Sequence, residues 1–436
     1  MGDHRSQEQI SEQDFQAAVS WRRSLHKYAQ PSWLEFYATG FVAEKLTAWG
    51  YDVQTGESII DREKLLLLPS QQKLDEEYQR ALDAGIPEKF VSAAKGGLTG
   101  VVATLKGKQP GPVIGFRFDI DSNEVFESYD PEHRPCREGF ASAKPGYAHA
   151  CGHDAHTATG LLLAKWFADN RDSLKGTVKL IFQPNEENLS GAAAMVDKGV
   201  VDDVEYMLAG HVGTAANQLG KVACDVRGIL AMARFEVTFI GRATHSAASP
   251  QEGKNALLGA CAAIANLHGI ARHAGGATTV NVGYIQAGTT WNVVPEKAYF
   301  QMEVRGFSTE INQYMVDRAK EIINGAAQMH GLSYEIKPAA VSFGGVNSPE
   351  LVALAEQVAK QVPGVTELMN QPSIGGSEDY TVFMRRVQEK GGKAIFFLFG
   401  TPTGGGHHNA RFDIDEQVLK NAAEFYIAMY RGITTK

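Results

Sequence analysis

The chain has 436 residues, of which 44% are hydrophobic and 21% are charged. This length predicts two or three domains, and this composition excludes disordered, collagen-like and low-complexity proteins. The 42 basic and 50 acidic residues give a net charge of −8. Because nucleic-acid binding needs a basic surface, we expect no nucleic-acid partner.

Cysteine spacing and the N-terminal segment bear on the cellular compartment. The four cysteines lie far apart, at positions 136, 151, 224 and 261, which argues against a disulfide scaffold. The opening residues MGDHRSQEQISEQDF are polar and lack the apolar segment of a secretory signal. No run reaches the roughly 18 apolar residues that span a bilayer. We therefore expect a cytoplasmic protein that does not bind a membrane.

Strands and helices are predicted to alternate up to residue 227. Apolar residues at helical spacing predict two helices within 12–50. The unusually charged stretch 62–95 looks like an insertion, with a helix over 72–85. The later predicted elements are strands at 99–105, 112–118, 177–182 and 205–209 and helices at 155–169 and 191–199. This order is typical of a mostly parallel sheet with helices on both faces.

The pattern changes at residue 228. Residues 228–340 predict the order β-α-β-β-α-β, which is the ferredoxin-like order. The alternation of helices and strands then resumes, with helices at 349–361 and near 377–388, a strand at 393–399 and a helix at 416–430. The sequence thus predicts an α/β domain of residues 1–227 and 341–436, with residues 228–340 inserted as a second domain.

Metal-capable side chains follow several predicted strands of the larger domain. They are Asp119 and Asp121, Glu186 and Glu187, His211, and His407 and His408. A fifth cluster, the octapeptide HACGHDAH of residues 149–156, opens the helix at 155–169. Because ligands bind outside the carboxyl ends of the strands in such sheets, we expect these clusters to meet at one edge.

The five clusters differ in how strongly they indicate a metal site. Cys151 and His153 in HACGHDAH suit a divalent metal, although Cys151 could also be an ordinary buried cysteine. A lone histidine or acidic pair is usually structural, so the convergence of five clusters carries the argument. The adjacent Glu186 and Glu187 can divide the work of metal hydrolysis, one binding the metal and the other accepting a proton from water.

The motifs HACGHDAH, QPNEE, GHVG, GRATHSAASP, WNVVP and GHHNARFD occur in this order. With them the chain resembles the dinuclear metallo-aminoacylase and carboxypeptidase G superfamily, in its amidohydrolase branch. The resemblance covers nearly the whole chain. It implies a metallohydrolase domain with an inserted lid and dimerisation domain, and two divalent metal ions per site, zinc or manganese. QPNEEN and GHVGT depart from the commoner family patterns, which bears on the shape of the substrate site.

The resemblance also implies roles for single residues. The implied metal ligands are Cys151, His153, Glu187, His211 and His408, with Cys151 bridging two metals. Glu186 is the implied general base and acid, and Asp121 orients a ligand. His408 is preferred to His407 because the family histidine precedes a phenylalanine by four positions, as His408 precedes Phe412.

The inserted domain contributes three further candidates. By resemblance, His245 stabilises the oxyanion in the active site of the partner subunit. Asn292 and Arg305 match residues that hold the carboxylate of the substrate, a contact that suits the planar guanidinium. Without the resemblance, His245 would be a surface-loop residue and Arg305 a charge at the edge of a strand.

The resemblance predicts hydrolysis of the amide bond of an N-acyl amino acid, with p-aminobenzoyl-glutamate favoured. A general N-acyl-amino-acid deacylase or dipeptidase is the alternative enzyme. A scaffold subunit of a two-chain hydrolase is the alternative outside catalysis, but the retention of Glu186, Glu187 and all proposed ligands argues against it. The expected assembly is a homodimer or a heterodimer with a related chain.

Overall fold

The computed structural model describes residues 9–435, which form two compact units. The first runs to Arg227 and also holds residues 346–374 and those from Asp379 on; the second holds residues 228–345 and 375–378. The helices of the first unit are α1 (Glu12–Lys27), α2 (Phe36–Ala48), α3 (Gln71–Asp83), α4 (Arg134–Arg137), α5 (His153–Asp169), α6 (Gly191–Val196), α9 (Pro349–Ala359), α10 (Tyr380–Glu389) and α11 (Gln417–Thr434).

The first unit is built on a mixed, mostly parallel sheet. Its strands are β1 (Asp52–Gln54), β2 (Val101–Lys106), β3 (Gln109–Asp119), β4 (Lys175–Gln183), β5 (Tyr206–Val212), β6 (Lys221–Ala223), β11 (Glu367–Leu368) and β12 (Lys393–Phe399). Within residues 9–435 their order is β1-β2-β4-β3-β5-β12-β6-β11. The central strands β4, β3, β5 and β12 pair in parallel, so their carboxyl ends meet at one edge.

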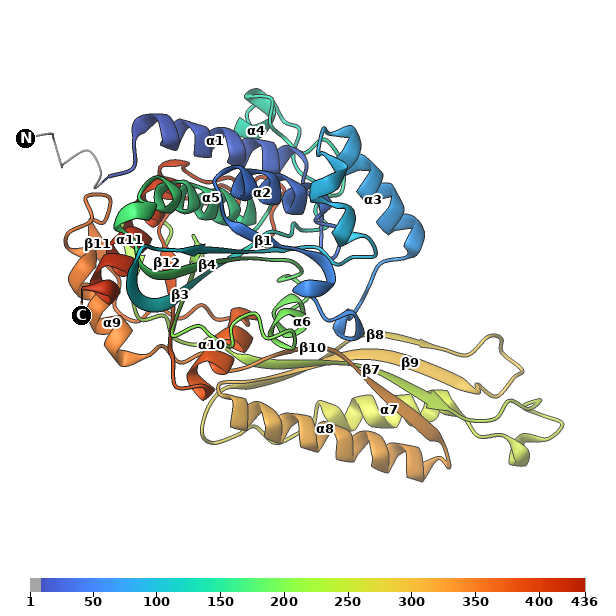
Figure 1. Ribbon diagram of the computed structural model, residues 1–436. Helices are drawn as coiled ribbons and strands as arrows, with labels where there is room; N and C mark the ends of the chain where they lie inside the picture. The colour runs from blue at the N-terminus through green and yellow to red at the C-terminus, as the bar shows by residue number, and fades with distance from the viewer. Residues whose placement is uncertain (1–8, 436) are drawn as a thin grey trace, which may run out of the picture. The chain divides into compact units, whose positions relative to one another are not determined.

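Neighbouring phenylalanines in β12 show why helices cover both faces of this sheet. Phe397 packs against Phe425 and Tyr426 of α11, whereas Phe396 packs against Tyr380 of α10. Successive side chains of a strand point to opposite faces, so α10 and α11 lie on opposite sides. Figure 1 shows the same layers, with α1, α2 and α5 on one side of the sheet and α6 and α10 on the other. The predicted α/β fold is confirmed.

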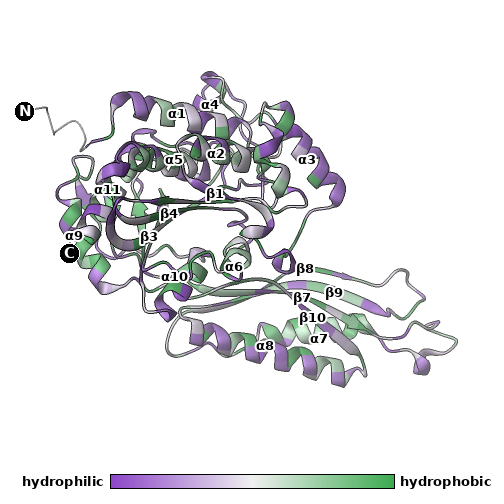
Figure 2. Cartoon of the chain, viewed as in Figure 1, coloured by the Kyte–Doolittle hydropathy of each residue, from purple (hydrophilic) through white to green (hydrophobic). Residues whose placement is uncertain are grey.

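The charged stretch between β1 and β2 contains α3. The helix begins after Ser70, whose hydroxyl accepts a hydrogen bond from the N–H of Lys73. It ends at Asp83, two residues before the end predicted from Gly85. Its surface is predominantly hydrophilic (Figure 2), because only four of its residues, Leu74, Glu77, Tyr78 and Ala81, are buried. The helix therefore packs by one narrow face.

The second unit has the predicted order of elements. These are β7 (Ala231–Ile240), α7 (Ala256–Leu267), β8 (Thr278–Ala287), β9 (Lys297–Gly306), α8 (Thr309–Met329) and β10 (Ser333–Ser342). The strands form an antiparallel sheet in the order β10-β7-β9-β8, which is the ferredoxin-like arrangement. Its core gathers the apolar sides of α7 and α8, including Ala260, Met315 and Ile323, against Phe300 and Val304 of β9.

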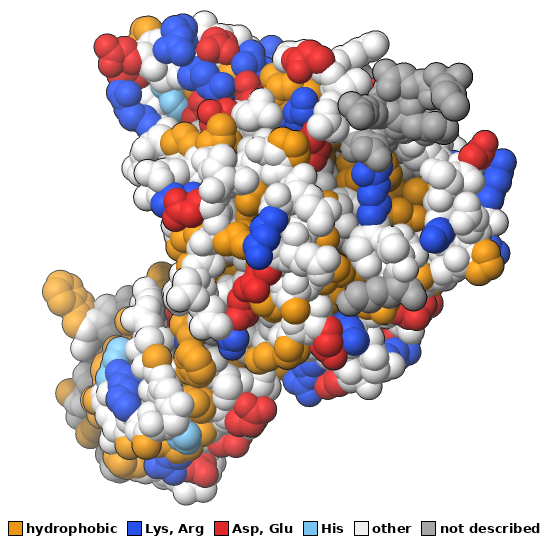
Figure 3. Space-filling model, turned by 90° about the vertical axis from the view of Figure 1, so that its left-hand side faces the viewer, with side chains coloured by type: hydrophobic (Ala, Val, Ile, Leu, Met, Phe, Trp, Pro, Cys, Tyr) orange, Lys and Arg blue, Asp and Glu red, His pale blue; other side chains and the backbone are white. Residues whose placement is uncertain are grey.

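Acidic and basic side chains are interspersed over the face in Figure 3, as the near balance of the two charges implies. None of the four cysteines, all within residues 9–435, forms a disulfide. No helix in the same range combines the length and the apolar character needed to cross a bilayer.

Candidate functional site

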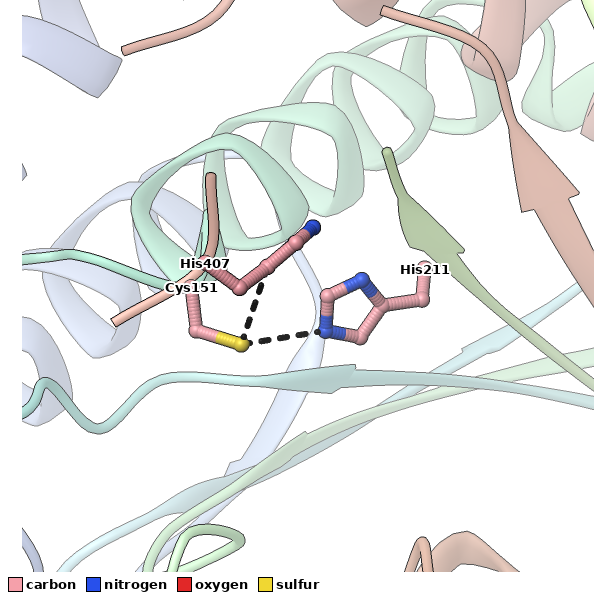
Figure 4. A group of neighbouring side chains, drawn as sticks. All are labelled: Cys151, His211 and His407. Atoms are coloured by element: carbon pink, nitrogen blue, oxygen red, sulfur yellow. Dashed lines mark hydrogen bonds between the residues drawn. The ribbon is translucent and has the colours of Figure 1, made fainter. Parts of the chain in front are cut away.

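The carboxyl ends of the central strands bring two histidines together around Cys151. The thiol of Cys151 lies 3.5 Å from Nε2 of His211 and 3.4 Å from Nδ1 of His407. His211 belongs to the end of β5, and His407 to the loop that follows β12. Figure 4 shows the sulfur between the two imidazole rings. Segments more than 250 residues apart thus meet at this edge of the sheet.

Gly152 explains how Cys151 and His153 can stand on either side of one sharp turn. Gly152 precedes α5 and has a φ of 91°, which glycine adopts without strain. A Cβ at this position would lie 2.6 Å from Cγ2 of Val212. The Cys-Gly-His tripeptide therefore needs glycine at its centre.

The loop that carries Glu186 and Glu187 is fixed from two sides. Asn185 has a left-handed φ of 54°, and its N–H donates to the buried carboxylate of Glu35 at 2.8 Å. Glu35 also accepts the hydroxyl of Thr99 at 2.6 Å. On the other side, the N–H of Glu187 donates to Oδ2 of Asp121 at 3.0 Å. Glu35 was not predicted from the sequence, because a lone acidic residue at a helix start carries no motif.

Hydrogen bonds to Nδ1 set the orientation of two histidines. Nδ1 of His211 donates to the carbonyl of Val212 at 2.8 Å, and Nδ1 of His153 lies 3.1 Å from Oδ1 of Asp121. In both rings Nε2 is left to face the cluster. A carbonyl or carboxylate partner of this kind raises the basicity of a metal-binding imidazole.

Two buried atoms at the centre of the cluster have no hydrogen-bond partner within residues 9–435. They are Nε2 of His153 and Oε1 of Glu187, which lie 3.8 Å apart. Leaving such atoms unpaired costs about 1–3 kcal/mol each. Because metal–ligand distances are about 2.0–2.2 Å, one cation between the two atoms could bind both. The residues present therefore fit a divalent metal.

The pKa values of the side chains in the cluster shift in both directions. Burial and neighbouring histidines hold the pKa of His211 well below its usual range, and burial lowers the pKa of His407 to about 4. Burial alone would raise the pKa of Glu187, but the hydrogen bond to His408 and the charge of His153 lower it to about 2. Burial opposes protonation of His153, but the charge of Asp119 raises its pKa well above its usual range, and hydrogen bonds with Cys151 and Glu187 raise the pKa of His408 to about 10. Because metals bind neutral imidazoles and ionised carboxylates, metal binding would displace the protons of these two rings.

Both histidines of the pair at 407–408 reach the cluster. His407 contacts Cys151 through Nδ1, and its Nε2 accepts the N–H of Thr214 at 2.8 Å. His408 has a left-handed φ of 58°, and its Nε2 lies 3.4 Å from Oε2 of Glu187. The neighbouring groups of possible ligands, Cys151–His211–His407 and Cys151–His153–Glu187, share the thiol of Cys151.

His156, the last residue of HACGHDAH, is held by partners outside the cluster around Cys151. His156 hydrogen-bonds to Asp119 through Nδ1 and accepts the N–H of Val212 through Nε2. Asp119 in turn pairs with the buried Arg117, whose guanidinium also reaches Asp379 at 3.0 Å. Asp379 was likewise not predicted from the sequence. These contacts hold the residues next to the cluster in place.

A buried ion network lies behind α5. Oδ2 of Asp154 forms an ion pair with Nε of Arg22 at 2.7 Å and lies 2.8 Å from Nδ1 of His26. Nε2 of His26 lies 2.9 Å from Oε1 of Glu127. Burial and the charge of Arg22 oppose protonation of His26, but these two carboxylates raise its pKa to about 9. His149, whose pKa burial lowers to about 3, is the neighbouring ring.

The other predicted site residues lie in the second unit. His245 is exposed, and its Nδ1 accepts the N–H groups of Ala247 and Ala248. The carbonyl of Asn292 accepts the N–H of Ser246, so the loops of His245 and Asn292 are joined. Arg305 lies on β9 and pairs with Glu303 at 2.9 Å.

Comparison with known proteins identifies the family. Residues 115–431 match Peptidase family M20/M25/M40. The chain belongs to this family. Its members are metal-dependent hydrolases, as the motifs predicted, and the chain is an enzyme of this class.

Two relatives are similar over nearly their whole length. The chain is 45% identical over 407 residues to the indole-3-acetyl-aspartic acid hydrolase of Enterobacter agglomerans, covering 93% of each protein. It is also 45% identical over 405 residues to one subunit of the p-aminobenzoyl-glutamate hydrolase of Escherichia coli (strain K12), again covering 93% of each. The predicted resemblance to this branch is confirmed.

Solved structures agree with these relatives. The aminobenzoyl-glutamate utilization protein from Klebsiella pneumoniae has a TM-score of 0.80 and 38% identity, covering 96% of both chains. A dinuclear metal-binding peptidase of the M20 family from Bacillus subtilis has a TM-score of 0.67 and 26% identity, covering 97% of this chain and 99% of the other. Dinuclear metal binding thus occurs within the family.

Proposed function

We propose that this chain hydrolyses the amide bond of an N-acyl amino acid in which an aromatic acyl group is joined to an acidic amino acid. Both relatives with 45% identity are named for substrates of this kind, indole-3-acetyl-aspartic acid and p-aminobenzoyl-glutamate. We take p-aminobenzoyl-glutamate as the first candidate. Its cleavage releases p-aminobenzoate and glutamate.

One observation carries the chemistry: the buried, unpaired Nε2 of His153 and Oε1 of Glu187 lie beside a thiol that two groups of possible ligands share. This supports two divalent ions, zinc or manganese, which the two groups of ligands would hold with Cys151 common to both. The proposed ligands are Cys151, His153, Glu187, His211 and His408. His407, which touches the same thiol, is the alternative to His408.

The residues around the cluster divide the steps of hydrolysis. When bound, a divalent metal supplies Lewis-acid activation of water and of the scissile carbonyl. Glu186 lies with its Oε2 4.0 Å from Nε2 of His153, beside Glu187 but outside the proposed ligands. We assign to Glu186 the transfer of a proton from water to the leaving amine. Asp121 keeps the ring of His153 and the backbone of Glu187 in place.

The second unit supplies the remaining groups in this proposal. The exposed ring of His245, held through Nδ1, can donate from Nε2 to an oxyanion in the site of a partner subunit. Asn292 and Arg305 hold the substrate carboxylate. The assembly is then a homodimer, or a heterodimer with a related chain. Four free cysteines suit a reducing compartment, and we propose the cytoplasm.

The test is hydrolysis of a substrate panel by the purified chain, loaded with zinc or manganese and compared with the chelated form. The panel contains p-aminobenzoyl-glutamate, indole-3-acetyl-aspartate, acetyl-glutamate and a dipeptide. We expect metal-dependent release of p-aminobenzoate, and its loss in Glu186→Gln. Faster cleavage of the dipeptide or acetyl-glutamate would favour a dipeptidase or general deacylase. If the metal-loaded chain shows no turnover alone, and turnover appears only when a related chain is added, a scaffold role would be favoured.

A further inference from the structure

A pocket of about 470 Å³ opens beside the proposed metal cluster. Glu187 and His408 line one end of it, so the pocket is continuous with the cluster. Its volume lies within the roughly 300–1,000 Å³ of ordinary small-molecule sites. A substrate whose carbonyl group lies at the cluster could therefore extend one of its two ends into this pocket.

Five of the thirteen residues that line the pocket are apolar, and the other eight are polar or charged. Pro31 and Leu34 come from the turn before α2, Leu67 and Pro69 from the segment before α3, and Val125 from the loop after β3. The first four lie before residue 115, where the match to the family begins. The pocket thus combines two proposed metal ligands from the matched region with four apolar residues from outside it. The five apolar residues offer contact to a flat hydrocarbon surface and no partner to a carboxylate.

Leu67 is held in an unusual conformation at this wall. Its φ is 56°, in the left-handed region that leucine rarely adopts. The indole N–H of the fully buried Trp33 donates to the carbonyl of Leu66 at 2.8 Å and fixes the preceding residue. The side chain of Leu67 remains 43% exposed and lines the pocket. Backbone strain of this kind concentrates at ligand-binding sites.

The polar rim is electrically balanced. Nζ of Lys73 lies 2.7 Å from Oε1 of Glu124, and both residues line the pocket. Glu124 thus already supplies Lys73 with a carboxylate partner. A carboxylate such as Glu124 also accepts hydrogen bonds from a ring N–H or an aromatic amine. These features suit a ring with a polar substituent.

We propose that this pocket, lined by Leu67, Pro69, Leu34 and Val125, is the subsite that binds the aromatic acyl group of the substrate. The proposal deepens the proposed function and rests on it. The segment before α3 sets the preference for aromatic acyl groups over acetyl. The amino-acid end of the substrate points away from this segment.

The test compares Leu67→Asn with Leu68→Asn in the metal-loaded full chain. Asparagine tolerates a left-handed φ, so Leu67→Asn should fold as well as the wild type. Leu68 is the matched control, because it is the next residue, is 41% exposed and does not line the pocket. The readouts are kcat/KM for p-aminobenzoyl-glutamate and acetyl-glutamate, calorimetric binding of p-aminobenzoate, and the melting temperature.

We expect Leu67→Asn to lower the ratio of kcat/KM values, aromatic over acetyl, by about tenfold, and Leu68→Asn to leave that ratio within about twofold. Equal losses for both substrates, or equal effects of both variants, would overturn the proposal while the proposed function stands. If the wild type cleaves neither substrate, the proposed function fails, and calorimetry decides on the pocket. Weaker p-aminobenzoate binding in Leu67→Asn alone would then support the subsite, and unchanged binding would refute it.

Discussion

Gly191 is the residue at which the smallest change should disturb the proposed catalytic loop most. A Cβ at position 191 would lie 1.7 Å from the carbonyl oxygen of Pro184, whereas real Cβ atoms keep at least 3.0 Å from such neighbours. In Gly191→Ala the backbone must therefore move by at least about 1.3 Å. Pro184 directly precedes the loop with Glu186 and Glu187, so these carboxylates shift with it.

The expected magnitudes follow from this displacement. Forcing an extra carbon into a packed site costs about 1–3 kcal/mol of unfolding free energy. A misplacement of roughly 1 Å near reacting groups costs about 100-fold in turnover. The assay measures kcat on p-aminobenzoyl-glutamate, metal content and urea unfolding for Gly191→Ala.

Gly325 provides the matched control for this substitution. It lies within α8, and nothing stands within 4 Å of the Cβ that alanine would add. Gly325→Ala should stabilise the chain by about 0.5–1 kcal/mol, because glycine is a poor helix former. Wild-type turnover and metal content in Gly191→Ala would refute the steric argument.

Four further predictions concern the site and its surroundings. Glu186→Gln should keep its metal, measured by elemental analysis, and lose about 10²–10⁴-fold in turnover, whereas Glu187→Gln should lose metal; equal metal loss would reverse these roles. Chelation should lower the melting temperature. A ligand that binds only the folded chain, at a concentration 100 times its Kd, adds about 2.7 kcal/mol to the free energy of unfolding. An unchanged melting temperature would contradict a bound metal. The pKa of His26, raised to about 9, exceeds its unfolded value of about 6.5, so its stabilisation is complete below about pH 6.5 and is lost as pH rises through 9. The difference in unfolding free energy between wild type and His26→Gln should therefore shrink by up to about 3 kcal/mol over this range, and a constant difference would refute it. Mixing His245→Ala with Glu186→Gln chains should restore activity once the two chains exchange partners if His245 acts across an interface; no recovery despite exchange would place it elsewhere.

Long apolar or strongly periodic segments were predictable from the sequence. The strand KAIFFLF was predicted at 393–399 and occupies those residues, and the helix predicted over 72–85 spans 71–83. The short strands β1, β6 and β11 were missed. Each has only two or three residues, and such segments pair because the neighbouring strand is already in place, so they carry no periodic pattern of their own.

Residues that stand in motifs were predictable as site candidates. The residues that hold them in place were not predictable. Cys151 and His153 stand in one octapeptide, which made them visible. Glu35 binds the backbone of Asn185 across 150 residues of sequence, and Asp379 meets Arg117 across 262. Such contacts exist only in three dimensions, and a single acidic residue gives no sign of them in the chain. The left-handed backbone conformation of Leu67 was not predictable either, because a run of leucines normally indicates ordinary backbone conformations.

The position of β12 has a consequence for how the protein is made. This strand lies between β5 and β6 in the middle of the sheet, yet it is encoded near the end of the chain. Until residues 393–399 leave the ribosome, β5 has an open edge with unpaired backbone groups, which favours mispairing. His407 and His408 emerge later still. The nascent chain can thus complete the sheet of its second unit, whose strands lie within 231–342, before it can build a metal site.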